Sequence, residues 1–256
     1  MTPEGWLPLL VDLADRADAI SLRYFRSRTL RVDEKPDRSL VTEADLAVEQ
    51  SVRDLVAARH PELGIFGEEQ GEQAGASETR LIVDPIDSTA NFARGIPVYA
   101  TLLAIEAEGE VVAGLVSAPA LGQRWHAAHG SGAWSGDRRL EVSGVRSLGD
   151  AQLFHGSLAG GEAVQGTQRI QALIGRTWRQ RGFGDFYQHL LVAEGCGEIA
   201  IDPILSPWDA APLQVIVEEA GGRSSSTRGE RSIYTGSLLS SNGLLHDEAI
   251  AILAQS

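Results

Sequence analysis

Cysteine is almost absent from this chain: Cys196 is the one cysteine among 256 residues. A single cysteine cannot form an internal disulfide, so a reducing compartment, the cytoplasm, is expected. Basic residues are also scarce, because 22 lysines and arginines stand against 35 aspartates and glutamates, for a net charge of -13. Nucleic acid and anionic membranes would repel such a surface, so neither is expected as a partner.

Long apolar runs, a basic leader and zinc motifs are missing as well. No apolar stretch reaches transmembrane length. The N-terminal region contains Glu4 and Asp12 in place of a positively charged segment, so no signal peptide is expected. The six histidines show no H-x-H or H-E-x-x-H spacing. What remains is an ordinary globular composition, 43% hydrophobic and 22% charged, long enough to bury a large core in one domain or two lobes.

Apolar periodicity predicts several helices. An i, i+3, i+4 pattern covers residues 5–26. Thr42 and Asp45 have the spacing of a capping box, which predicts that a second helix begins there; it ends at His60 and Pro61. Further helices are expected at residues 167–174, 186–193, 209–220 and 247–253.

Short apolar runs predict strands at residues 63–66, 81–83, 98–106, 110–118, 124–128, 140–143, 198–201 and 238–241. Polar or glycine-rich segments predict loops at residues 71–79, 130–136, 160–166 and 224–226. We therefore expect a layered α/β fold with mixed sheets. An N-terminal lobe would cover residues 1–149 and a C-terminal lobe residues 150–256.

The stretch Leu81–Phe92, L-I-V-D-P-I-D-S-T-A-N-F, combines a buried strand with a helix start. It puts Asp84 and Asp87 at the point where the strand ends. Two carboxylates at such a position suit hard cations, and backbone N–H groups beside them suit a phosphate. The structural alternative is that Asp84 only forms a turn and Asp87 only caps the helix.

Two further acids extend this pattern. Glu68 follows the strand at 63–66, and Asp209, preceded by Trp208, begins a helix. All four side chains are oxygen donors without histidine or cysteine at ligand spacing, which favours Mg²⁺, or Mn²⁺ in its place, over zinc. Clustered carboxylates repel each other unless cations lie between them, and two or three Mg²⁺ ions would resolve this. Such a site can acidify a bound water and hold both oxygens of an in-line phosphoryl displacement.

The residues after Asp87 suggest roles for a phosphate ester and a water. Backbone N–H groups of Ser88 and Thr89 can hold phosphate oxygens. The Thr89 hydroxyl can hydrogen-bond the attacking water, and Asp45 can orient that hydroxyl. Glu68 would then be both a ligand and a base. Lys35 could approach this site, although we interpret it as a solvated side chain.

The order and spacing of several segments resemble the signatures of the inositol monophosphatase superfamily. These segments are Gly67–Glu69, Asp84–Thr89 with Asn91 and Phe92, Trp208–Ala211, Glu219–Gly222 and Val41–Asp45. The resemblance implies a two-lobed αβαβα sandwich like that of inositol monophosphatase and fructose-1,6-bisphosphatase. It also implies Mg²⁺-dependent phosphomonoester hydrolysis by direct attack of metal-activated water, inhibition by Li⁺, and a homodimer.

Roles for single residues follow from the same resemblance. The implied metal ligands are Glu68, Asp84, Ile86 through its carbonyl, Asp87 and Asp209. A Thr89–Asp45 pair is implied to activate water. The chain departs from the family at Ser88, where glycine is usual. If φ is positive there, the serine costs about 1 kcal/mol, and its side chain could crowd the phosphate or donate to it.

Segments outside the shared signatures, 94–101, 182–187 and 191–195, resemble the histidinol-phosphate phosphatase branch. Histidinol phosphate contains an ammonium group and an imidazole, with which Asp185 and Asp202 could pair. These acids could equally accept hydrogen bonds from inositol hydroxyls. Asp185 could also merely brace a glycine turn, and Asp202 merely end a strand.

The leading hypothesis is therefore a histidinol-phosphate phosphatase of histidine biosynthesis that acts on a small phosphorylated metabolite. The predicted substrate-binding residues are Asp87, Ser88, Thr89, Asp185, Asp202 and Asp209. The nearest alternative is an inositol-1-phosphate or broad sugar-phosphate phosphatase. A different class, a non-catalytic metal or phosphate sensor, would lack at least one of the acids or Thr89, and all are present.

Overall fold

Two large β-sheets with helices packed on them make up most of the fold, and residues 32–42 add a separate two-stranded antiparallel sheet. The structure, a computed structural model, describes residues 1–157 and 163–254. The helices are α1 (Leu7–Tyr24), α2 (Glu43–Arg59), α3 (Thr89–Ala93), α4 (Ala163–Ile174), α5 (Asp185–Ala193), α6 (Pro207–Glu219) and α7 (His246–Ala254). The strands are β1 (Val32–Glu34), β2 (Leu40–Thr42), β3 (Gly64–Gly67), β4 (Gly71–Gln73), β5 (Arg80–Asp87), β6 (Ala100–Ala107), β7 (Glu110–Ala118), β8 (Gln123–Ala128), β9 (Gly132–Ser135), β10 (Arg138–Arg139), β11 (Gln152–His155), β12 (Arg179–Gly182), β13 (Ile199–Asp202), β14 (Arg223–Ser225) and β15 (Leu238–Ser241).

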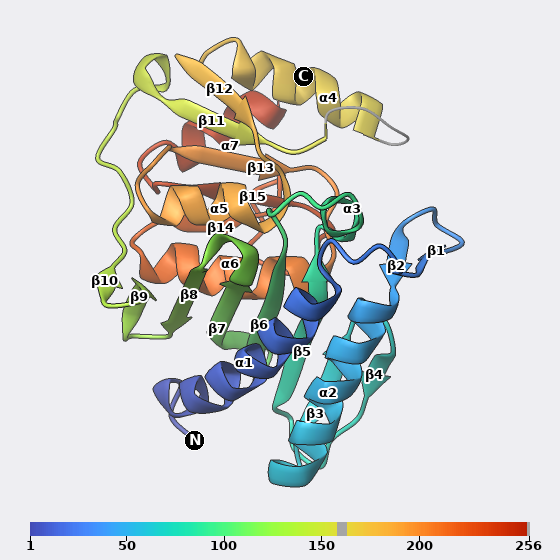
Figure 1. Ribbon diagram of the computed structural model, residues 1–256. Coiled ribbons are helices and arrows are strands. Elements are labelled where there is room, and N and C mark those ends of the chain that lie inside the picture. The colour runs from blue at the N-terminus through green and yellow to red at the C-terminus, as the bar shows by residue number, and fades with distance from the viewer. Residues whose placement is uncertain (158–162, 255–256) are drawn as a thin grey trace.

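These elements stack in five layers (Figure 1). An eight-stranded sheet has the order β10-β9-β8-β7-β6-β5-β3-β4, and a five-stranded sheet has the order β12-β11-β13-β15-β14. Helices α1 and α2 cover the outer face of the larger sheet, α5 and α6 lie between the sheets, and α4 and α7 cover the smaller sheet. Both sheets mix parallel and antiparallel pairs. The expected αβαβα sandwich is confirmed.

Strand β5 is buried on both faces, as its continuous apolar run predicts. Leu81 and Val83 pack into the core beneath α1 and α2, whereas Ile82 packs toward α5 and α6. Because successive side chains of a strand point to opposite faces, this one strand joins two hydrophobic cores. Apolar packing on both faces therefore fixes the position of β5 in the sheet, independently of its acidic residues.

Helix α6 crosses the larger sheet very closely at Gly114 of β7. A Cβ atom there would lie 2.7 Å from Val215 Cγ1 and 2.9 Å from Pro212 Cα. Only glycine leaves room for this approach. The contact brings the first turn of α6, which contains Asp209, to the end of β5.

Some of the expected local structure is wrong. Residues 71–79 were expected to be a loop, but 71–73 form β4, which pairs antiparallel with β3. Residues 224–226 were likewise expected to be a loop, yet 224 and 225 belong to β14. Strands β11 and β12 were not predicted. These strands are short and several are polar, so their sequences show no alternation of apolar and polar residues. They form because they pair with neighbouring strands.

The opposite error occurs at residues 140–143, which were expected to be a strand. Leu140 N–H donates to Ala133 O at 2.8 Å and Val142 N–H donates to Ala220 O at 3.1 Å. These isolated bonds to different elements form no ladder, so the alternating pattern reflects packing alone. The predicted turn at 130–136 contains β9. Within the predicted loop 160–166, residues 160–162 lie outside the described residues, and 163–166 begin α4.

The larger sheet lies within residues 1–149 and the smaller within 150–256, but α6 packs on the larger sheet, so the division into lobes stays a prediction. Among residues 1–157 and 163–254, no helix has the length and apolar character needed to span a bilayer.

The close approach at Gly114 gives a first prediction. Gly114→Ala should destabilise the fold by about 1–3 kcal/mol, because the added methyl group overpacks the α6 contact. Thermal unfolding should show this as a Tm lower by about 2–4 °C per kcal/mol. Gly144→Ala is the control, since a Cβ at Gly144 meets nothing within 4 Å. Equal Tm values for the two variants would contradict the prediction.

Candidate active site

A β-bulge in β5 gives Asp84 and Asp87 a common direction. Residues three apart in a regular strand point to opposite faces. Here Asp84 pairs with Leu102 and Asp87 with Ala100, so β5 has one residue more than β6 over this interval. The Thr101 hydroxyl donates to Pro85 O at 2.8 Å and satisfies a carbonyl in the bulge. The strand thus continues to Asp87, beyond the end that we predicted at residue 83.

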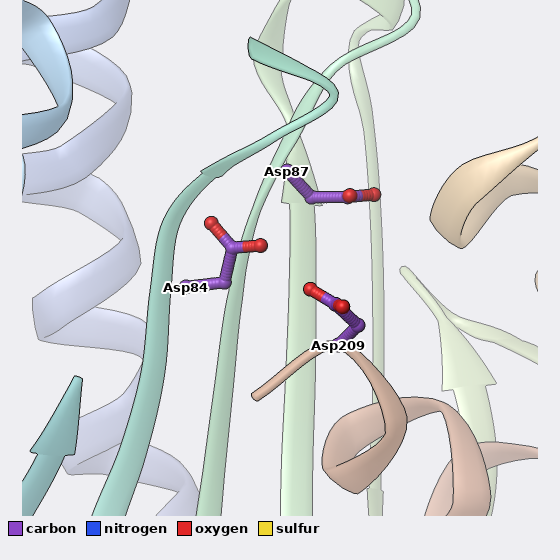
Figure 2. Close-up of side chains that lie close together, drawn as sticks. All are labelled: Asp84, Asp87 and Asp209. Atoms are coloured by element: carbon purple, nitrogen blue, oxygen red, sulfur yellow. The ribbon is translucent and has the colours of Figure 1, made fainter. Parts of the chain in front are cut away.

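Three carboxylates converge at this bulge. One oxygen from each of Asp84, Asp87 and Asp209 lies within 4.8 Å of the others, and Figure 2 shows the three side chains gathered where β5 meets the start of α6. Asp87 Oδ2 accepts the Phe186 N–H at 2.9 Å, and Asp209 Oδ2 accepts the Ser206 N–H at 2.9 Å. Asp84 Oδ1 is buried and has no hydrogen-bond partner in the part of the chain that the structure describes.

Burial makes these carboxylates hard to ionise. It raises the pKa of Asp84 well above the usual range, and the charges of Glu68, Asp209 and Asp87 raise it further. The pKa of Asp87 is likewise raised well above its usual range by burial and by the charge of Asp185. Burial raises the pKa of Asp209 to about 6. A partnerless buried oxygen inside an acidic cluster is the environment that a divalent cation would stabilise, so the donors fit the metal that the sequence predicts.

The predicted ligand Glu68 lies beside this cluster and is paired with a lysine. Lys35 Nζ donates to Glu68 Oε1 at 2.9 Å and to Glu69 Oε1 at 2.7 Å. Burial alone would lower the pKa of Lys35, but the hydrogen bonds to Glu69 and Glu68 raise it. Our interpretation of Lys35 as a solvated side chain was therefore wrong. It lies in the turn between β1 and β2, where its sequence position gave little sign of these partners.

A buried ion pair on α2 holds the turn that contains Glu68. Glu49 is fully buried and accepts hydrogen bonds from Arg53 at 2.7 Å and from the Glu69 and Gln70 N–H groups at 2.8 and 3.1 Å. The turn lies so close to α2 that a Cβ at Gly67 would be 2.3 Å from Glu49 Oε1. Sequence reasoning missed Glu49; a charged residue on the apolar side of a predicted helix was the available signal.

Asp45 serves two hydroxyls with its two oxygens. Asp45 Oδ2 accepts the N–H and hydroxyl of Thr42, which completes the predicted capping box of α2. Asp45 Oδ1 accepts the Thr89 hydroxyl at 3.2 Å, and Thr89 Oγ1 also lies 3.0 Å from Ile86 O. Burial raises the pKa of Asp45 to about 6. Asp45 therefore caps α2 with one oxygen and contacts the Thr89 hydroxyl with the other, so its two predicted interactions are compatible.

The remaining predicted residues lie around the acidic cluster. Ser88 adopts a left-handed backbone conformation with φ 66°, so the predicted cost of about 1 kcal/mol applies. Asp185 begins α5, and burial raises its pKa, as does the charge of Asp202. Asp202 Oδ2 is held from within the fold by Gln188 and by His189 Nε2, the latter at 3.0 Å. Asp202 is thus anchored beside the site, and its contact with a substrate stays a prediction.

Comparison with known proteins agrees with this geometry. The model of the inositol monophosphatase family matches residues 3–256. The chain belongs to this family. A histidinol-phosphatase of Mycobacterium tuberculosis is 44% identical over 96% of this chain and 97% of that protein. An inositol-1-monophosphatase of Rhizobium meliloti is 32% identical over 94% and 93%. The solved structure of the suhB protein of Bartonella henselae has a TM-score of 0.92 at 28% identity and covers 98% of this chain and 99% of that one.

The acidic cluster of this family member predicts a pH-dependent response to Mg²⁺. The folded-state pKa of Asp209, about 6 against an ordinary 3.8, means that its protonated form stabilises the fold and that this contribution is lost as the pH rises from about 4 to 6. A cation that binds to these carboxylates would have to displace those protons, and Mg²⁺ is the cation that we expect. The increase in Tm caused by Mg²⁺ should therefore be small at pH 5 and large at pH 7.5. A Mg²⁺ concentration of 100 times Kd would raise the free energy of unfolding by about 2.7 kcal/mol.

Differential scanning fluorimetry with and without Mg²⁺ measures this response. The difference removes contributions common to both samples, such as that of His246, whose pKa is lowered to about 4 by burial. Asp209→Asn should abolish most of the Mg²⁺ effect. An equal Mg²⁺ effect at both pH values would contradict competition between protons and the metal.

The Glu49–Arg53 pair generates a separate prediction. Glu49→Gln should destabilise the fold by about 3–5 kcal/mol, since Arg53 loses its buried partner. It should also weaken Mg²⁺ binding, because the turn that contains Glu68 is no longer held. Isothermal titration well below Tm measures the affinity. Asp54→Asn, the same change at an exposed site of α2, is the control. Normal Mg²⁺ affinity in Glu49→Gln would show that the pair acts on stability alone.

Proposed function

We propose that the chain is a Mg²⁺-dependent phosphomonoesterase that hydrolyses L-histidinol phosphate to L-histidinol and phosphate. The observation that carries this proposal is that the chain has a higher sequence identity with a histidinol-phosphatase than with an inositol-1-monophosphatase. The relative named histidinol-phosphatase shares 44% of its residues with the chain over nearly the full length, and the relative named inositol-1-monophosphatase shares 32%. The proposal assigns the chain to histidine biosynthesis.

The charge around the acidic cluster supports a cationic substrate. Asp185 raises the pKa of Asp87, and Asp202 raises the pKa of Asp185, so these carboxylates are close enough to repel one another. An ammonium or imidazole group of the substrate would relieve that repulsion, and its N–H groups could donate charge-assisted hydrogen bonds to these carboxylates. An inositol ring would offer hydroxyl groups alone.

The metal in this proposal would be held by the acids already described. Asp84, Asp87, Asp209 and Glu68 would supply carboxylate oxygens, and Ile86 its carbonyl, to two or three Mg²⁺ ions, with Mn²⁺ as a substitute. When bound, the ions supply positive charge that stabilises a phosphate ester under attack. Asp84 Oδ1, which is buried and has no hydrogen-bond partner among the described residues, is the oxygen that would gain most from such an ion.

The chain's own groups would direct the water and the phosphate. Thr89 donates its hydroxyl proton to Asp45 Oδ1, so Thr89 Oγ1 keeps its lone pairs for a proton of the attacking water. Thr42 fixes the other oxygen of Asp45, which limits rotation of the carboxylate. Glu68 is the proposed base. The backbone N–H groups of Ser88 and Thr89, at the start of α3, would orient the phosphate oxygens.

Several accompanying expectations stay predictions. The resemblance implies a homodimer and inhibition by Li⁺, and the single cysteine agrees with a cytoplasmic location. The alternative substrate, inositol 1-phosphate or another sugar phosphate, would use the same metal ligands and the same Thr89–Asp45 pair. The choice between the two therefore depends on residues outside the acidic cluster, of which Asp185 and Asp202 are the proposed ones.

Substrate preference is tested by phosphate release with Mg²⁺ present. We expect kcat/KM for L-histidinol phosphate to exceed that for D-myo-inositol 1-phosphate about a hundredfold, equal to about 2.7 kcal/mol of transition-state discrimination. Asp185→Asn should reduce this ratio, and Asp137→Asn, an exposed acid on the outer edge of the larger sheet, should leave it unchanged. A preference for inositol 1-phosphate would overturn the substrate assignment. The absence of turnover in Glu68→Gln would support the catalytic role.

A further inference from the structure

Two residues with side chains adopt left-handed backbone conformations beside the acidic cluster. Ser88 has φ 66° and ψ 45°, and Asp185 has φ 53°. Such a conformation costs an ordinary residue about 1–2 kcal/mol, whereas glycine adopts it freely. Non-glycine residues held in this region concentrate at functional sites, where the side chain has a use that outweighs the strain.

A hydrogen bond brings these two residues together. Asp87, directly before Ser88, accepts the N–H of Phe186, directly after Asp185, at 2.9 Å. The end of β5 is thereby joined to the first turn of α5. Ser88 and Asp185 are therefore each one residue away from this hydrogen bond. The Ser88 hydroxyl also lowers the pKa of Asp185, against the rise that burial causes.

The hydroxyl of Ser88 is not used elsewhere in the described part of the chain. Ser88 is the N-cap residue of α3, yet its side chain makes no capping hydrogen bond. Its Oγ atom is buried and has no partner at normal hydrogen-bond geometry among the described residues. A buried hydroxyl without a partner costs about 1–3 kcal/mol, so a small rotation toward the nearby Asp185 would be favourable.

We propose that Ser88 is a specificity-determining residue: its hydroxyl donates to Asp185 and holds that carboxylate toward the cationic end of the substrate. This inference rests on the proposed function and names the residue pair that would separate a cationic from an uncharged alcohol phosphate. An ionised carboxylate has about four acceptor positions, so a bond from Ser88 fixes Asp185 and still leaves positions for an ammonium or imidazole N–H.

The test uses variants that separate the hydroxyl from the backbone strain. Ser88→Ala removes the hydroxyl and keeps the left-handed position occupied by a side chain. Ser88→Gly removes both the hydroxyl and the strain. Glu108→Gly is the matched control, because Glu108 has φ 54° in the exposed β6–β7 turn and lies away from the site. It should be more stable thermally and leave the substrate ratio unchanged.

We expect Ser88→Ala to lower the ratio of kcat/KM for histidinol phosphate over inositol 1-phosphate about tenfold, mainly through KM for histidinol phosphate. Ser88→Gly should change the ratio equally while raising Tm. Because Ser88 is proposed to act through Asp185, adding Ser88→Ala to Asp185→Asn should cause little further loss. Additive losses in the double variant would overturn the pairing.

Other outcomes also decide the matter. An equal loss for both substrates would mean that Ser88 contacts the phosphate, and an unchanged ratio would mean that its hydroxyl has no role; either result overturns the proposal. If the wild-type enzyme does not prefer histidinol phosphate, the proposed function fails by itself. The pair is then tested with O-phosphoethanolamine against glycerol 2-phosphate, and the proposal falls unless the wild-type enzyme prefers the cationic ester and Ser88→Ala loses that preference.

Discussion

Repulsion among buried carboxylates is the constraint on which the rest of this structure depends. Asp84, Asp87 and Asp209 are crowded together where water cannot screen them, and burial opposes their ionisation. The cluster therefore destabilises the isolated fold, and the cores on both faces of β5 must offset that cost. A divalent cation bound between these carboxylates would offset their repulsion and so stabilise the fold.

The sandwich meets this constraint by attaching each acid to rigid backbone. Asp87 is held by an N–H group in the first turn of α5, and Asp209 and Asp45 are held by the N–H groups of Ser206 and Thr42, the N-cap residues of α6 and α2. None of these carboxylates depends on a long loop for its position. The site is thus assembled from a bulged strand and several helix starts, whose geometry the surrounding layers determine.

The sequence predicts the acids better than it predicts what holds them. The apolar run before Asp84 and the capping box of Thr42 and Asp45 were local patterns, and the structure contains both. The bulge after Asp84 and the Glu49–Arg53 pair were missed. Pro85 hinted at an irregular strand, but the count of residues in a bulge depends on β6, its neighbour. Polar strands such as β12 likewise exist because of partners distant in sequence.

The order of the elements along the chain has a consequence for synthesis on the ribosome. Strand β5 emerges before α5 and α6, so the nascent larger sheet has no Asp209 and no helix over the face that includes Ile82. Until α5 packs there and α6 docks at Gly114, that apolar face can contact other chains. Docking of α6 thus adds the third carboxylate and completes burial of the apolar face of the sheet in one step. A chain in which α6 has not docked would be prone to aggregate and could not assemble its acidic cluster.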